Sequence, residues 1–97
     1  MHVISYKHLR AYIEDYPDSK VSLGRWYARM KEGTFNDLNE LKRKFSDVDY
    51  VGNDRYVFNI GGNKYRLVAL INFKAHRTYV RYIGSHADFN KIDCSNI

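Results

Sequence analysis

RYVFNIGGNKYRLVALINF, residues 55–73, has the pattern of two β-strands joined by a tight turn. β-Branched and aromatic residues dominate both halves, and either Gly61-Gly62 or Gly62-Asn63 suits a two-residue hairpin turn. Both turns divide the side chains between the two faces in the same way. One face would carry Tyr56, Phe58, Ile60, Tyr65, Leu67, Ala69, Ile71 and Phe73, and the other Arg55, Val57, Asn59, Lys64, Arg66, Val68 and Leu70. We expect the first, apolar face to lie beneath helices.

The second face combines aliphatic side chains with Asn59, Lys64 and Arg66, an odd choice for a core. These three residues together suit an anion-binding groove. A solvated arginine on an open sheet face would explain Arg66 as well, because antiparallel sheets often have one wet side. The residues alone leave both interpretations open.

Downstream of the hairpin, RTYVRYIG at residues 77–84 predicts a third strand, which completes a meander. The length of the connection around residues 74–76 is uncertain, so alternation does not place Arg81 on either face. Ser85 suits the N-cap of a short terminal helix, although the segment from residue 85 to 93 fits a tail equally well. His86 directly follows the strand, where a histidine can exchange protons near neutral pH, but most surface histidines have no such role.

Upstream of the hairpin the apolar residues have helical spacing. One stripe comprises Leu9, Tyr12, Ile13 and Tyr16 and ends at Pro17, and a second comprises Leu23, Trp26, Tyr27 and Met30, between Asp18 or Ser19 as cap and Gly33. A shorter helix is expected from Asn36 as cap through Leu38, Leu41 and Phe45, with Lys42, Arg43 and Lys44 turned mostly elsewhere. Residues 1–5 predict an opening strand, and residues 46–54 a connection. Together these elements predict an α+β fold that spans residues 1–97 as one domain. Its N-terminal helices would lie on one face of a mainly antiparallel four-stranded sheet.

Composition narrows the class of partner. The 97 residues include 16 Lys and Arg against 11 acidic residues, and the net charge of +5 favours a polyanionic partner. Cys94 is the only cysteine and the four histidines lack ligand spacing, so we expect no metal. No Walker, dinucleotide or nucleophile-elbow motif is present, so we expect no cofactor. Without a secretory segment or a run of about 18 apolar residues, a cytoplasmic protein is expected.

Two blocks of the sequence resemble a known family. VFNIGGNKYRLVALINF at residues 57–73 and YVRYIGSHADF at 79–89 are similar to the paired strand motifs of HigB-type toxins, members of the RelE-like group. The resemblance implies a ribosome-dependent endoribonuclease that cleaves messenger RNA and is held inactive by a HigA-like antitoxin with a helix-turn-helix domain. It also implies active-site roles for Asn59, Arg66 and His86, with Arg81 in the same block. The family's tyrosine and aspartate after the histidine are replaced by Phe89 and Asn90, so Tyr79 would have to supply any phenol.

The chemistry implied is attack of the RNA's own 2′-hydroxyl on the neighbouring phosphate. Arg66 suits the cation that stabilises the growing charge, because a guanidinium stays charged and presents paired donors to phosphate. His86 suits the general acid or base. Contacts with RNA or the ribosome are expected from Lys42, Arg43, Lys44, Lys64, Lys74 and Tyr79. Two alternatives stay open: a ParE-like toxin that poisons DNA gyrase by binding, and a small RNA-binding protein without catalysis.

Overall fold

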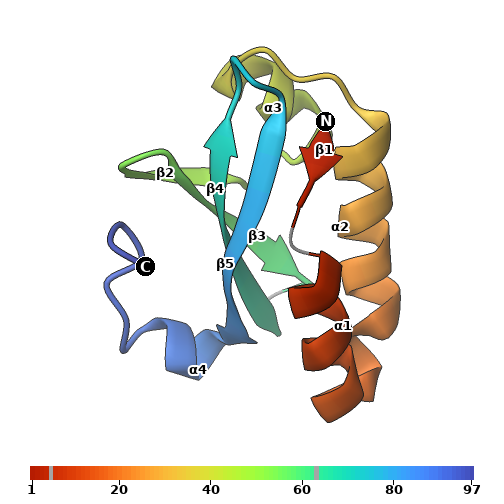
Figure 1. Cartoon of the computed structure of the whole chain (residues 1–97). Coiled ribbons are helices and arrows are strands. Elements are labelled where there is room, and N and C mark those ends of the chain that lie inside the picture. Colours follow the sequence, from red (N-terminus) through yellow and green to blue (C-terminus); the bar gives the residue numbers. More distant parts are fainter. Residues whose placement is uncertain (5, 63) are drawn as a thin grey trace.

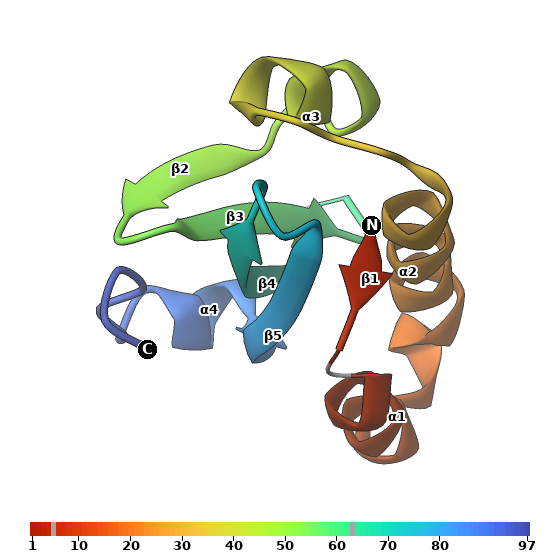
Figure 2. The same ribbon diagram turned by 45° about the horizontal axis from the view of Figure 1, so that its top comes forward.

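A computed structural model describes residues 1–4, 6–62 and 64–97 and has the expected α+β architecture. The strands are β1 (His2–Val3), β2 (Asp49–Gly52), β3 (Arg55–Ile60), β4 (Tyr65–Asn72) and β5 (Arg77–Ser85), and the helices are α1 (Tyr6–Asp15), α2 (Lys20–Glu32), α3 (Leu38–Lys44) and α4 (His86–Phe89). They form one mixed sheet in the order β1-β5-β4-β3-β2, in which β1 is parallel to β5 and the other pairs are antiparallel. Helices α1 and α2 lie on one side of the sheet, and α4 with the C-terminus lies on the other (Figures 1 and 2).

The hairpin of β3 and β4 has one of the two predicted registers. Ile60 pairs with Tyr65, and the Lys64 amide donates to the Gly61 carbonyl at 3.3 Å. This is the register that a Gly62-Asn63 turn produces, although Asn63 itself lies outside the described residues. Gly61 and Gly62 both have positive φ, which glycine adopts without a steric penalty.

The two faces of this hairpin are divided as the alternation predicts. The core cluster contains every member of the apolar set except Phe73, which packs against the cluster. Phe58 contacts Trp26 of α2 and Phe45 edge to face, so the centre of the core lies between β3 and the helices. Val57 and Val68 are also buried, but they belong to the opposite face and lie outside this cluster.

The helices follow the predicted stripes with three differences. Tyr16 is 49% exposed, because α1 ends at Asp15 and a 3-10 turn, Pro17–Ser19, leads directly into α2. Gly33 does end α2, but with extended backbone; an added methyl group there would lie 2.6 Å from Cε2 of Phe35, so the close ring explains the glycine. The cap of α3 is Asp37 and not Asn36, since its carboxylate accepts from the Glu40 amide at 2.9 Å.

A fifth strand, β2, lies where we expected only a connection. Gly52 pairs with Arg55, so Asn53 and Asp54 form a two-residue turn, and both have positive φ. Asn and Asp tolerate this conformation, which hairpin turns of this length require. The turn formers in residues 46–54 therefore mark the end of a hairpin and not a loop between two halves.

Within the described ranges, no helix combines the length and apolar character that crossing a bilayer requires.

Candidate active site

The face of the sheet opposite α1 and α2 is organised in rows of side chains across β3, β4 and β5. From one end to the other the rows are Arg55–Leu70–Tyr79, Val57–Val68–Tyr82 and Asn59–Arg66–Gly84. The middle row contains the two buried valines, whereas the last row carries the predicted site residues. We call the Asn59–Arg66–Gly84 row the polar row.

Asn59 and Arg66 lie side by side in the polar row, as directly paired residues of β3 and β4. The amide of Asn59 donates from Nδ2 to Asp47 at 2.8 Å, which fixes its orientation. Arg66 is half-buried, and its Nη1 donates to the Tyr65 carbonyl at 3.3 Å. Among the described residues no carboxylate pairs with Arg66, so most of its donors are available to an anion.

Tyr82 brings a phenol to the polar row, and sequence reasoning missed it. A methyl group added at Gly84 would lie 2.6 Å from Cζ and 2.9 Å from Cε2 of Tyr82, so the ring lies directly over the glycine that pairs with Arg66. Burial and then the nearby Asp88 raise the pKa of Tyr82, so the phenol is protonated at neutral pH and can donate a hydrogen bond.

The proposed substitute phenol, Tyr79, is placed elsewhere. Tyr79 pairs with Leu70, and Leu70 lies four residues along β4 from Arg66, or about 13 Å. Glycine at position 84 is the signal that could have identified Tyr82, because a strand glycine often marks the close approach of another group.

His86 lies at the end of the polar row nearest α4. Its amide donates to the Lys64 carbonyl at 3.3 Å, which continues the pairing of β4 with β5 by one residue. Ser85 is the N-cap, as predicted, and its hydroxyl accepts from the Asp88 amide at 3.1 Å. The imidazole is exposed and comes two residues after Gly84, about 7 Å along the chain. Its backbone thus lies next to the end of β4 from which Arg66 projects.

Arg81 is assigned to the same face, but away from the polar row. It lies at an irregularity in the β4–β5 pairing, between Tyr82, which pairs with Val68, and Val80, which pairs with Ala69. Its Nε donates to the Ile97 main-chain oxygen at 3.3 Å, and Nε of Arg55 donates to the same oxygen at 2.9 Å. Because both guanidinium groups donate to Ile97, Arg81 binds the segment after α4 together with Arg55.

The other predicted contact residues are scattered over the surface. Lys42, Arg43 and Lys44 form the exposed last turn of α3. Lys64 forms an ion pair with Asp18, whose other carboxylate oxygen accepts from the Tyr65 hydroxyl at 2.7 Å. Lys74 lies in the turn between β4 and β5, at the opposite end of the sheet from His86. The structure therefore pairs Asn59 with Arg66 and places the His86 backbone just beyond their row, whereas the predicted lysine and arginine contacts with RNA are spread over the surface.

The polar row supplies a cation and an amide, the Tyr82 ring over Gly84 adds a protonated phenol, and His86 beyond the end of the row adds an exposed imidazole. Hydrogen-bond donors predominate, which suits a phosphodiester whose charge grows during cleavage. Within residues 1–4, 6–62 and 64–97, no group of three His, Cys, Asp or Glu side chains is arranged to hold a metal ion.

Comparisons with a family and with individual proteins agree with each other. Residues 19–92 match a family described as HigB_toxin, RelE-like toxic component of a toxin-antitoxin system. The chain is 33% identical to the "mRNA interferase HigB" of Escherichia coli O6:H1 over 95% of this chain and 91% of that protein. It is also 33% identical to the "mRNA interferase toxin HigB" of Escherichia coli K12 and to the "mRNA interferase HigB" of Shigella flexneri, over 93% of this chain and 88% of each relative.

Proposed function

The chain belongs to the HigB family of RelE-like toxins, and we propose that it is a toxin that cleaves messenger RNA at the polar row of its sheet. The main support for this site is that Asn59, Arg66 and Gly84 are adjacent in the sheet. The Tyr82 ring lies over the glycine, and His86 follows just beyond. The relatives are named for nuclease activity, which does not favour gyrase poisoning or RNA binding without catalysis.

The reaction forms a bond between the 2′-oxygen and phosphorus and breaks the bond from phosphorus to the 5′-oxygen. The 2′-hydroxyl loses its proton to a base, and the departing 5′-oxygen gains one from an acid. The products are a 2′,3′-cyclic phosphate and a free 5′-hydroxyl. Arg66 stabilises the phosphorane oxygens through its paired donors.

His86 and Tyr82 supply the remaining groups. His86 is the proton-transferring residue, because an exposed imidazole can both accept and donate a proton. Tyr82 donates a hydrogen bond to a phosphate oxygen, since its raised pKa keeps the phenol protonated. Asn59 holds the RNA chain beside Arg66. Arg81 holds the segment that ends at Ile97 in position.

The family membership implies an antitoxin partner and an mRNA substrate. We further propose that the antitoxin is HigA-like with a helix-turn-helix domain, and that cleavage occurs in the cytoplasm on the ribosome. A ribosome would hold the messenger in position, and positioning alone can supply a large part of a rate enhancement. This suits a small site with few catalytic groups.

The test is a comparison of two lysine substitutions. Arg66→Lys keeps the charge but loses the planar fork, so cleavage of mRNA on translating ribosomes should fall by about 10²-fold or more. Arg81→Lys is the matched control and should cleave within about threefold of the wild type, since only the segment near Ile97 loses a contact.

His86→Gln should reduce cleavage by about 10²-fold with unchanged ribosome affinity, because glutamine cannot transfer a proton. Circular dichroism checks that the three variants are folded. Wild-type rates for both Arg66→Lys and His86→Gln would remove the polar row as the active site.

A further inference from the structure

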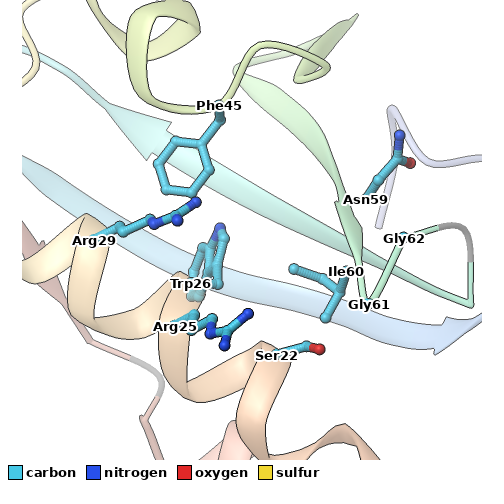
Figure 3. Close-up of a pocket in the computed structure, with 9 residues that line it drawn as sticks. All are labelled: Ser22, Arg25, Trp26, Arg29, Phe45, Asn59, Ile60, Gly61 and Gly62. Atoms are coloured by element: carbon cyan, nitrogen blue, oxygen red, sulfur yellow. The ribbon is translucent and has the colours of Figure 1, made fainter.

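A second group of donors lies on the helix side of the same hairpin. An open cavity of about 190 Å³ is bounded by α2, by Phe45 after α3 and by the turn after β3 (Figure 3). Arg25 and Arg29 lie one turn apart on α2, and Figure 3 shows both side chains beside Trp26 at this cavity. Both arginines are exposed.

Within residues 1–4, 6–62 and 64–97 these two arginines have no anionic partner. The ion pair in the described part of the chain is between Lys64 and Asp18, and the cavity lining includes no Asp or Glu. Like charges one turn apart destabilise a helix slightly, by about 0.2–0.5 kcal/mol. An anion bound between them would remove this repulsion and use both forks.

Trp26 provides an independent sign of a missing ligand. The residue is 2% exposed, and its indole Nε1 is buried without a hydrogen-bond partner among the described residues. An indole N–H can only donate, so the missing group must be an acceptor. Buried polar groups without partners are rare in native proteins and need an explanation such as a bound ion or water.

Two of the residues that line the cavity connect it to the face of the sheet that carries the polar row. Asn59 both lines the cavity and belongs to the polar row. The pairing of β2 with β3 reaches Val57, so Asn59 lies past its end at the margin of the sheet, where a bound chain can pass from one face to the other. Phe45, which also lines the cavity, follows the basic last turn of α3 and brings a half-buried aromatic ring to the cavity.

We propose that this cavity binds a phosphate group of the RNA chain whose cleavage site lies at the polar row. The inference rests on the proposed function and adds a binding site on α2 that the sequence motifs do not contain. Arg25 and Arg29 hold the phosphate oxygens, and Trp26 Nε1 donates once the exposed arginine side chains adjust around the ligand.

The test uses Trp26, which is the only tryptophan of the chain, as a fluorescent reporter. The probe is a 2′-O-methyl RNA of about eight nucleotides, which binds as single-stranded RNA but lacks the attacking hydroxyl. It should change the emission of Trp26 saturably. Arg25→Gln combined with Arg29→Gln should raise the Kd about tenfold and reduce the slope of log Kd against log salt by about 0.7, the value for one phosphate.

The matched control is Lys7→Gln combined with Arg10→Gln on α1, which removes the same charge at exposed positions on another helix. It should change the Kd less than about threefold, as expected for screened, distant charges. Equal effects of the two double variants, or constant Trp26 emission when RNA is added to the wild type, would overturn the inference.

A hexaglutamate peptide serves as a second probe. If it saturates the Trp26 signal and RNA does not displace it, the cavity belongs to an acidic protein segment and the proposal is wrong. Cleavage is measured separately with unmodified mRNA on ribosomes. Active wild-type enzyme with no RNA effect at Trp26 refutes this site alone, whereas inactive wild-type enzyme refutes the proposed function.

Discussion

Gly84→Ala tests whether the position of the Tyr82 phenol matters for cleavage. Gly84 is not among the glycines with positive φ, so its backbone accepts alanine. The new methyl group would lie 2.6 Å from Cζ of Tyr82, whereas carbon atoms normally contact at about 3.5–4.0 Å. The ring must therefore move by about 1 Å. A displacement of this size at a catalytic group can reduce the rate by about 10²-fold.

The loss of stability should be much smaller than the loss of activity. Overpacking costs about 1–3 kcal/mol, and because the clash involves the end of a side chain we expect the lower end of this range. Reduced freedom of the unfolded chain offsets about 0.4–1 kcal/mol. Urea unfolding should thus show a loss of about 1 kcal/mol or less, with the protein folded at working temperature.

A double-mutant cycle identifies the cause. With Tyr82→Ala in the background the clash is absent, so Gly84→Ala should no longer destabilise, and the coupling energy should be about 1 kcal/mol. Gly24→Ala is the matched control, because nothing lies within 4 Å of an added methyl group there and helix propensity predicts a gain of about 0.5–1 kcal/mol. A Gly84→Ala enzyme with the wild-type cleavage rate would refute the role of Tyr82.

Three further outcomes are expected. Changing Lys42, Arg43 and Lys44 together to Gln should weaken RNA binding and reduce the slope of log Kd against log salt by about 2, which a salt titration of binding would measure. The cleavage rate of the bound complex should stay unchanged in single-turnover experiments. Lys64 and then Tyr65 lower the pKa of Asp18, so its stabilising contribution is complete above the unfolded pKa of about 3.9 and is lost as pH falls through the folded value. The urea midpoint of the wild type should therefore exceed that of Asp18→Asn near neutral pH, and the gap should close toward about pH 2; a constant gap would contradict this. Cleavage should survive EDTA once magnesium is restored to keep the ribosomes intact, and recovery only with zinc or manganese would show a metal requirement.

The helices and the central hairpin were predictable because each buries one face. Leu23 and Met30 recur at helical spacing, and Phe58 and Leu67 alternate with residues of the other face, so burial and periodicity agree. Strand β2 was missed because Asp49 and Tyr50 are exposed at the margin of the sheet. An edge strand of this kind is stabilised by pairing with its neighbour, and its own sequence shows no alternation of apolar and polar residues.

The candidate site was predictable only in part. Asn59 and Arg66 could be assigned to one face, since both possible turns place them on the same side of the hairpin, whereas their direct pairing depends on the turn. Tyr82 could not be assigned in this way, because the irregularity at Arg81 inserts one residue into β5 and changes the face on which later residues lie. A break of this kind depends on three-dimensional pairing, and it places Val80 and Ile83 together in the core although strict alternation would put them on opposite faces.

The parallel pairing of β1 with β5 joins His2 to Arg77 and so constrains the order of events during synthesis. Helices α1 and α2 emerge from the ribosome first, but their apolar faces have no sheet to cover until the meander follows. Contacts so distant in the chain form slowly, and the exposed faces invite aggregation or chaperone binding in the interval. The polar row is assembled from the strands made last. A nascent chain therefore lacks an assembled polar row until these last strands have emerged and paired.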